Sequence, residues 1–302
     1  MKSAHLLAYA LSTPWAMMPE RMAAYAAVLA SHYAGELPPA RTPQAADSPA
    51  STGSMRGNRA GNIAVIPVMG AMVEWAHQID MCDGGTSMRL VQQALDASEA
   101  DDTISQVLMV YSTPGGSVHG MQELGDTINR VKASKPVIGV AQSLAASAGY
   151  WALSQCTEAY CTPGGEVVSI GVYSGYQNIS KALEAAGIDI RLFTAGKYKT
   201  ELSPFGEGLT PEAIAYQEKR ANDYYVMFTK AVAKGRSVGI DAVRNGMGEG
   251  RVLGADDALA AGMIDGIMTF EQVVKKMQRS AKAANRGGRA AAMNREIEIL
   301  SL

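Results

Sequence analysis

Apolar and polar residues follow two different spacings along the middle of the chain, one typical of strands and the other of helices. Short apolar runs predict buried strands at 63–68, 107–111, 137–141 and 188–193. Apolar positions at helical spacing predict helices over 87–98, about 118–132, about 147–153 and near 269–279. Thr210 as N-cap, with Pro211 at the first helical position, begins a further helix that we expect to reach about Lys234. This alternation predicts stacked βαβ units and therefore an α/β fold with a largely parallel sheet.

The predicted α/β domain covers residues 61–279 and is flanked by segments of different composition. Residues 1–35 are expected to form a helical N-terminal arm, and residues 36–60 a linker rich in Pro, Ala and Ser. Residues 280–302 form a basic, Ala-rich C-terminal tail, since the stretch 275–295 carries seven cationic residues and no acidic one. Such a tail is either solvated or docks onto an acidic protein or nucleic acid.

Composition excludes several classes of protein. The 302 residues carry 27 Lys and Arg against 29 Asp and Glu, and a net charge of −2 argues against a dedicated nucleic-acid binder. No run of about 18 uncharged apolar residues occurs, so no membrane span is predicted. The three cysteines lack CxxC spacing, which argues against a disulfide framework and a zinc site. We therefore expect a soluble, enzyme-sized protein of a reducing compartment.

The first residues leave one alternative open. Lys2 followed by the apolar stretch 6–11 has the form of a secretory signal, with Ala16 as a small residue at its cleavage site. That stretch ends at Ser12 after about six residues, shorter than the usual range of about 7–15. The helical arm is therefore the favoured interpretation.

Three polar segments each follow a predicted strand, the position at which α/β folds collect their sites. The segment 112–117 holds Gly115 and Gly116, whose backbone N–H groups suit an oxyanion hole. The segment 143–151 places a serine at a strand-to-helix junction, where the helix dipole favours negative charge. The segment 195–200 holds two lysines around a tyrosine. Together these segments suggest nucleophilic catalysis by a serine.

Each segment also has a plain structural explanation. The two glycines can form an ordinary tight turn, Ser143 or Ser147 can simply cap a helix, and the lysines can be surface charge. In the functional interpretation a lysine acts as general base. Its pKa, ordinarily about 10.4, must then be lowered by burial in an apolar site.

A lysine is favoured as the base because the histidines are badly placed. The chain has four, at positions 5, 32, 77 and 119, and none follows the candidate nucleophile. A Ser…His…Asp order along the chain is therefore impossible. A triad that uses His119 in another order remains an alternative to the Ser–Lys pair, which is a known variant of the same geometry.

Taken together, the segments resemble the signal peptide peptidase A family of serine peptidases, which is related to the caseinolytic protease and crotonase folds. The resemblance covers about residues 60–275 and rests on four motifs in order. They are Thr113-Pro-Gly-Gly116, Ala146-Ser-Ala-Gly-Tyr150, Val168-Ser-Ile-Gly-Val172 and Gly196-Lys-Tyr-Lys199. Two residues depart from the family pattern, because Ala148 and Val168 stand where glycine is usual.

The resemblance implies a role for each motif and makes the domain 61–279 a Ser–Lys peptidase. Ser147 would be the nucleophile, Lys199 the general base and Ser169 the residue that orients the lysine amine. The backbone N–H groups of the Gly-Gly turn, Gly115 and Gly116, and of Ala148 would form the oxyanion hole. Lys197 is the competitor for the base. No metal or cofactor is needed, and the family suggests a ring-like homo-oligomer.

Within this family, the N-terminal segment 12–21 and the basic tail resemble phage minor capsid protein C-type head maturation proteases. That resemblance implies a protease of the host cytoplasm and the phage prohead that cleaves scaffold, portal or capsid protein. Three alternatives remain: a signal peptide peptidase of the cell envelope, a crotonase-type acyl-CoA enzyme and a non-enzymatic capsid-assembly protein. No membrane span and no specific nucleic-acid site are expected.

Overall fold

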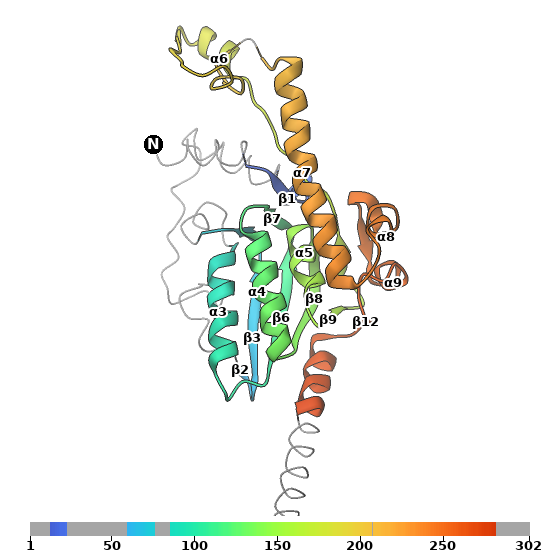
Figure 1. Ribbon diagram of the computed structural model, residues 1–302. Helices are drawn as coiled ribbons and strands as arrows, with labels where there is room; N and C mark the ends of the chain where they lie inside the picture. Colours follow the sequence, from blue (N-terminus) through green and yellow to red (C-terminus); the bar gives the residue numbers. More distant parts are fainter. Residues whose placement is uncertain (1–12, 23–58, 76–84, 207, 282–302) are drawn as a thin grey trace, which may run out of the picture.

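The protein is described by a computed structural model, which covers residues 13–22, 59–75, 85–206 and 208–281. Most of the predicted N-terminal arm and linker, and nearly all of the C-terminal tail, lie outside these residues. The described part contains two sheets with helices packed against them (Figure 1).

The larger sheet has eight strands and is largely parallel. Its main path runs in the order β11 (Val252–Gly254), β10 (Glu166–Val168), β8 (Val137–Ala146), β6 (Gln106–Thr113), β3 (Ile63–Met69) and β2 (Arg59–Ala60). In addition, β9 (Glu158–Cys161) pairs with β8 and with β12 (Gly266–Ile267). The pairs β2–β3 and β10–β11 are antiparallel and the others are parallel. The predicted α/β fold is confirmed, as are the strands predicted at 63–68, 107–111 and 137–141.

Helices cover both faces of this sheet. On one face lie α3 (Met88–Ala100), α4 (Met121–Ser134), α5 (Ala148–Ser154) and α7 (Pro211–Arg236) (Figure 1). The predicted N-cap of α7 is confirmed, because the Thr210 side chain accepts a hydrogen bond from Ala213 N. The opposite face packs against the helix that begins at Phe270, whose Val273 and Met277 are buried. The remaining short elements are α8 (Ile240–Gly246), η3 (Gly248–Gly250) and α9 (Ala255–Ala260).

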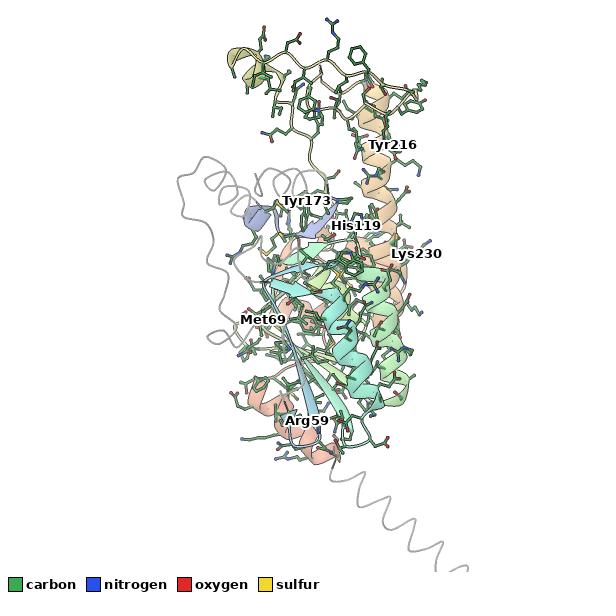
Figure 2. All side chains as sticks on the ribbon, turned by 90° about the vertical axis from the view of Figure 1, so that its left-hand side faces the viewer. Arg59, Met69, His119, Tyr173, Tyr216 and Lys230 are labelled. Carbon is green, nitrogen blue, oxygen red and sulfur yellow. The ribbon has the colours of Figure 1, made fainter. Side chains whose placement is uncertain are left out.

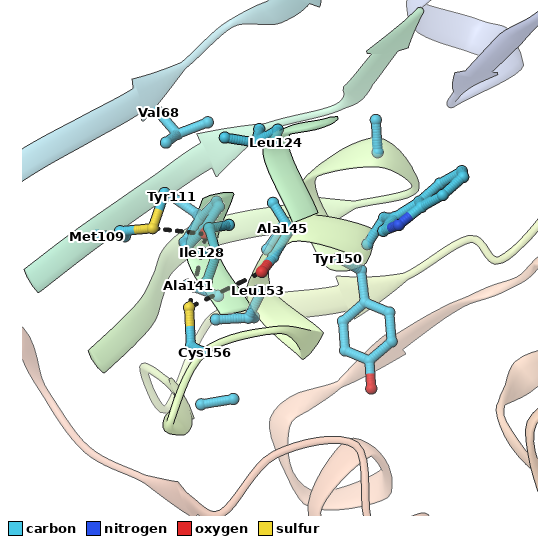
Figure 3. Packing of buried hydrophobic residues seen from close by; sticks show 14 of the residues in the cluster. Val68, Met109, Tyr111, Leu124, Ile128, Ala141, Ala145, Tyr150, Leu153 and Cys156 are labelled. Atoms are coloured by element: carbon cyan, nitrogen blue, oxygen red, sulfur yellow. Dashed lines mark hydrogen bonds between the residues drawn. The ribbon is translucent and has the colours of Figure 1, made fainter. Parts of the chain in front are cut away.

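The central strands are apolar on both faces, which explains their continuous apolar runs. Along β6, Met109 and Tyr111 belong to the core beneath α3, α4 and α5, whereas Leu108 and Val110 face the C-terminal helix. This alternation follows from the two-residue repeat of a strand. Figure 3 shows the helical side of the core, where Tyr111 OH donates to Met109 Sδ and lies 3.8 Å from Cys156 Sγ.

The pairing of β6 with β8 contains a register shift between Tyr111 and Ser112, close to the ends of both strands. Up to Tyr111 the two strands are in one register, and from Ser112 onward β6 pairs with residues further along β8. The first half of β8 pairs with β9 on its other side, and its last three residues pair with β10. A bulge of this kind bends a strand and redirects its end. On this side, the beginning of β8 therefore pairs with β9 and its end with β10.

The second sheet is small and includes part of the N-terminal segment. Its order is β1 (Trp15–Met17), β7 (Gly115–Ser117), β4 (Ala71–Val73) and β5 (Gly85–Ser87). The prediction of a helical arm is wrong at residues 15–17. These residues are buried and paired with β7, and the prolines at 14 and 19 disfavour helix at Thr13 and Met18 on either side of them.

The strand predicted at 188–193 is also wrong. Residues 174–206, which include α6 (Ser180–Ala185), form a projecting segment that extends beyond the sheets beside the first turns of α7 (Figures 1 and 2). Within the described part of the chain no strand pairs with 188–193, and the Phe193 side chain is 91% exposed. An apolar run identifies a strand only where the chain itself supplies a neighbouring strand.

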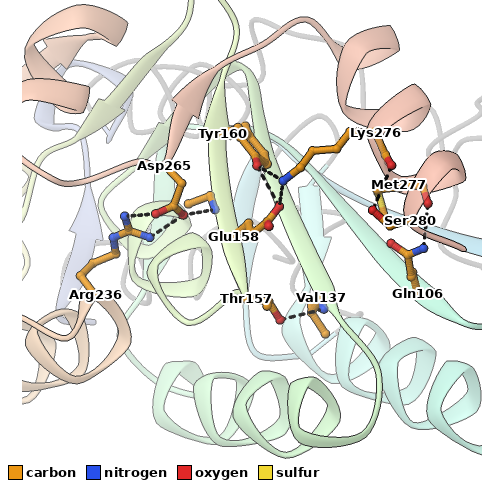
Figure 4. Close-up of polar contacts among 11 residues, drawn as sticks. Gln106, Val137, Thr157, Glu158, Tyr160, Arg236, Asp265, Lys276, Met277 and Ser280 are labelled. Atoms are coloured by element: carbon orange, nitrogen blue, oxygen red, sulfur yellow. Dashed lines mark hydrogen bonds and ion pairs between the residues drawn. The ribbon is translucent and has the colours of Figure 1, made fainter. Parts of the chain in front are cut away.

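The C-terminal end of α7 is joined to the larger sheet by an ion pair between Arg236 and Asp265 (Figure 4). Arg236 donates from Nη1 and Nη2 to the two oxygens of Asp265, at 2.9 and 2.8 Å, and Asp265 also accepts from Ala159 N. Burial acts to raise the pKa of Asp265, but the hydrogen bonds from Arg236 and Ala159 outweigh it and hold that pKa below its ordinary value. The carboxylate thus joins the end of α7 to the start of β9.

Asp265→Asn is expected to lower the free energy of unfolding by about 1.5–3 kcal/mol at pH 7, because it leaves the guanidinium without its charged partner. We expect the lower end, since the Asp265 side chain is 39% exposed. The lowered pKa stabilises the wild type above the unfolded-state value of about 3.9, and this stabilisation is lost as the pH falls through the folded-state pKa. Urea unfolding at pH 7 and near pH 3 measures both effects.

The matched control is Asp223→Asn, which breaks an exposed ion pair with Lys219 within α7. Such a pair contributes about 0.3–0.5 kcal/mol. Equal losses in the two variants would contradict a specific role for Asp265.

Candidate active site

Ser147 lies between the end of β8 and the first turn of α5. Its backbone has φ 53° and ψ −113°, a conformation that residues other than glycine rarely adopt and that tends to occur at functional sites. The side chain makes no helix-capping hydrogen bond, so the capping explanation does not apply. The residue is 1% exposed, and Oγ donates weakly to Gly171 O at 3.5 Å. Ser143, the other candidate cap, lies within β8 and pairs with Ser112 Oγ at 2.6 Å.

Thr113 holds the Gly-Gly turn close to this serine. Its hydroxyl donates to Gly70 O at 2.6 Å and accepts from Gly115 N at 3.1 Å. Its methyl group fills the space over Gly149, because a Cβ at Gly149 would lie 2.4 Å from Thr113 Cγ2. The turn and the first turn of α5 can approach this closely only because residue 149 has no side chain.

The glycines of the turn differ in what their backbone can do. Gly115 has φ 104° and donates its N–H to Thr113, so that group is already used. At Gly116 a Cβ would lie 1.9 Å from Met72 O, and no larger residue fits. Of the three predicted oxyanion donors, Gly116 and Ala148 therefore remain the better candidates.

Ser169 is brought beside Ser147 by the parallel pairing of β10 with β8. Val168 pairs with Ala146, so the residues that follow each strand are neighbours. Ser169 has φ 62°, is 7% exposed and donates its N–H to Arg251 O. The carboxyl ends of three strands thus collect the Gly-Gly turn, Ser147 and Ser169 in one place.

Lys199 is not part of this cluster in the single chain. It lies in the projecting segment, in a turn closed by a hydrogen bond from Lys199 N to Gly196 O, and its side chain is exposed. Its competitor Lys197 is in the same segment, where Nζ donates to Tyr198 OH and lies 3.5 Å from Glu212 Oε1. Tyr198 and Glu212 raise the pKa of Lys197, which is the wrong direction for a general base.

His119, the alternative general base, contacts a tyrosine, and the two described cysteines are unreactive. His119 Nε2 lies 3.5 Å from Tyr224 OH, and the two rings pack edge to face (Figure 2 labels His119). Burial raises the pKa of Cys156 to about 12 and that of Cys161 to about 11, so both thiols are protonated and poor nucleophiles. In the described ranges no cluster of three or more His, Cys, Asp or Glu side chains is arranged to hold a metal ion.

Sequence reasoning missed two contributors to this geometry. Thr113 was recognised only as part of a motif, although its hydroxyl and methyl group both position the turn. The strand β1 was missed altogether, and it runs along Gly115–Ser117. The available signal is indirect: Pro14 and Pro19 disfavour helix at the residues before them, Thr13 and Met18, which flank the strand.

The family model of peptidase family S49 matches residues 129–284. This chain belongs to peptidase family S49. The match includes three of the four motifs, those around Ser147, Ser169 and Lys199. The predicted relationship to signal peptide peptidase A-like serine peptidases is therefore confirmed.

Relatives of this S49 protein come from archaea, bacteria and phages. It is 30% identical over 191 residues to a protein assigned as a protease in Methanocaldococcus jannaschii, covering 63% of this chain and 61% of that one. It is 26% identical over 221 residues to capsid assembly protease C of Escherichia phage lambda, covering 73% and 50%. It is 27% identical over 226 residues to protease 4 of Haemophilus influenzae, covering 74% and 35%. The chain thus spans between about a third and three fifths of these relatives.

The S49 relatives thus include both phage and bacterial proteins. Among the described residues, no helix is long and apolar enough to cross a membrane.

Gly149→Ala is expected to slow peptide hydrolysis by about 10–100-fold, because the new methyl group displaces Thr113 and with it the Gly-Gly turn. The same overpacking should lower the free energy of unfolding by about 1–3 kcal/mol. Turnover of an unfolded protein substrate and urea unfolding measure the two effects.

Gly164→Ala is the control, since nothing lies within 4 Å of a Cβ there. Full activity in Gly149→Ala would show that the close approach of Thr113 is not needed for the chemistry.

Proposed function

We propose that this S49 protein is a serine endopeptidase with Ser147 as nucleophile, Lys199 as general base and Ser169 as the residue that orients the lysine. The observation that carries the proposal is the meeting of Ser147, Ser169 and Gly116 at adjoining strand ends. Ser147 stands there in a strained conformation with its hydroxyl free of any capping role.

The proposed mechanism is acyl transfer. Neutral Lys199 takes the proton of Ser147 Oγ, and the alkoxide attacks the carbonyl carbon of the substrate. The backbone N–H groups of Gly116 and Ala148 stabilise the tetrahedral oxyanion. The protonated lysine then gives its proton to the leaving amine, and water hydrolyses the acyl-enzyme.

We propose that the lysine comes from a second copy of this chain. A lysine amine is neutral near pH 7 only where an apolar surface removes it from water, and the exposed turn around Lys199 offers no such surface in one chain. The projecting segment also carries exposed apolar side chains, which indicate an interface. The large apolar side chains exposed on this segment are Ile188, Ile190, Leu192, Phe193, Tyr198 and Phe205. In a homo-oligomer, such as the ring-like assembly that the family resemblance implies, these side chains would be buried against the active site of a neighbouring copy.

Ser147→Ala is expected to lower hydrolysis of an unfolded protein by about 10⁴-fold or more, and Lys199→Ala by at least about 10²-fold, since one removes the nucleophile and the other the base. Lys197→Ala should stay within about threefold, because it removes only an exposed ion pair. Initial rates and the oligomeric state of each variant are measured together.

Mixing the two inactive variants tests where the base comes from. If Lys199 acts across an interface, co-refolded Ser147→Ala and Lys199→Ala chains regain part of the wild-type rate. A mixture that assembles and stays inactive would place both groups in one chain. Loss of activity in Lys197→Ala alone would make Lys197 the base.

For the biological role we propose head maturation in a tailed phage or prophage, with scaffold, portal or capsid protein as substrate, in the host cytoplasm and the prohead. Similarity to capsid assembly protease C of phage lambda over 73% of this chain supports this role. A signal peptide peptidase of the cell envelope is the second candidate, because a relative from Enterococcus faecium with that name is 26% identical over 185 residues.

Co-expression with the head proteins of the same genome separates these roles. Cleavage of a head protein by the wild type but not by Ser147→Ala supports head maturation. Intact head proteins together with cleaved signal peptides support the envelope role. Normal heads with uncleaved proteins in Ser147→Ala support a non-enzymatic assembly role.

A further inference from the structure

The strand β1 occupies the position beside Ser147 that an extended peptide substrate would need. One edge of β1 pairs antiparallel with β7, so that Ala16 lies opposite Gly116. Its other edge pairs with Tyr173, because Trp15 N donates to Tyr173 O at 2.8 Å and Tyr173 N donates to Trp15 O at 3.0 Å. The segment is thus held by backbone on both sides, between the Gly-Gly turn and the chain that follows Ser169.

The hydrogen-bond pattern identifies which carbonyl faces the candidate oxyanion hole. Met18 N donates to Pro114 O, and Val118 N donates to Pro14 O. The pairs Met18–Pro114 and Pro14–Val118 are thus hydrogen-bonded. Every second pair of an antiparallel ladder is hydrogen-bonded, so Ala16 and Gly116, which lie between those two pairs, are hydrogen-bonded as well. The Ala16 carbonyl therefore meets the N–H group of Gly116, the same group proposed to stabilise the oxyanion.

The nucleophile lies at the same peptide bond. A Cβ built on Gly115 would be 2.2 Å from Ala16 O, 2.9 Å from Met17 Cα and 3.0 Å from Ser147 Cβ. These three atoms surround one point in space. The bond between Ala16 and Met17 is consequently the one that β1 presents to Ser147.

The side chains of β1 fit this interpretation. Ala16 is fully buried and belongs to the main core cluster together with Met72, whereas Trp15 and Met17 pack on the other side with Ala71. The space that holds the Ala16 side chain, on the N-terminal side of the Ala16–Met17 bond, is therefore small and apolar. A substrate residue at this position would have to be about the size of alanine.

We propose that this protein cleaves its own chain between Ala16 and Met17, and that the same pocket selects small residues before the cleaved bond in other substrates. The proposal rests on the proposed function of Ser147 and Lys199. Ser147 Oγ forms an ester with the Ala16 carbonyl carbon as the bond to Met17 N breaks. The lysine transfers the Ser147 proton to the new amine of Met17, and water hydrolyses the ester to free the Ala16 carboxylate.

The test compares the full-length wild type with Ser147→Ala after purification, by intact mass and N-terminal sequencing. We expect a wild-type chain that begins at Met17 and a Ser147→Ala chain that keeps residues 1–16. A protein substrate is assayed in parallel. Cleavage after Ala16 that persists in Ser147→Ala overturns the proposal, because a host peptidase that removes a secretory signal would cut both chains.

Two substitutions of Ala16 test the pocket. Ala16→Gly should be processed within about tenfold of the wild-type rate, and Ala16→Phe more than about tenfold slower, because the buried pocket has no room for a ring. Ala16→Gly should hydrolyse the protein substrate as the wild type does, whereas uncleaved Ala16→Phe should hydrolyse it more slowly, because β1 still occupies the site. Thermal unfolding checks that each variant folds. The protein substrate is then varied at the residue before the cleaved bond, from Ala to Phe, to read the same preference outside the chain.

The outcomes separate this proposal from the proposed function. A wild type that hydrolyses the protein substrate but keeps residues 1–16 overturns self-cleavage and leaves the peptidase in place. Processing of Ala16→Phe as fast as the wild type overturns the pocket assignment. A wild type inactive on both the protein substrate and its own chain overturns the proposed function as well.

Discussion

The close approach of backbone segments around Ser147 is the constraint on which the rest of the site depends. Gly116 lies against Met72 O and Gly149 against Thr113, at distances that leave no room for a Cβ. The Gly149 contact brings the end of β6 to the first turn of α5, and the Gly116 contact packs β7 closely on β4. The donors of the turn and the nucleophile therefore share one space. The serine can be held in its strained conformation because the packing around it is nearly complete.

The bulge between β6 and β8 explains why three strand ends meet there. After the register shift, the end of β8 leaves β9 and joins β10, which brings Ser169 next to Ser147. A flat sheet with one register would keep β8 paired with a single neighbour on that side. The position of the orienting serine is thus a consequence of sheet geometry, and it depends little on local sequence.

The sequence predicts the central strands well, because strands buried on both faces are continuous apolar runs. Short strands such as β9 and β10 carry too few residues for a period to be visible. The run at 188–193 has the composition of a strand but no partner in the chain, so its pattern was misleading. The segments around Ser147 and Lys199 are recognisable beside predicted strands, whereas Ser169 comes only from the family resemblance. The pairing of Lys199 with the serine also rests on that resemblance, since nothing in one chain brings the two together.

Under the proposed function, a single copy of this chain cannot hydrolyse other substrates for two independent reasons. The strand β1 occupies the position beside Ser147, and the lysine lies on an exposed projecting segment. Assembly supplies the lysine, but it does not by itself remove β1, because β1 is held by backbone pairing on both edges. Cutting the bond opposite Gly116 would divide that strand at its centre and weaken both halves of the pairing. Access of other substrates to Ser147 would then require both assembly and cleavage of β1.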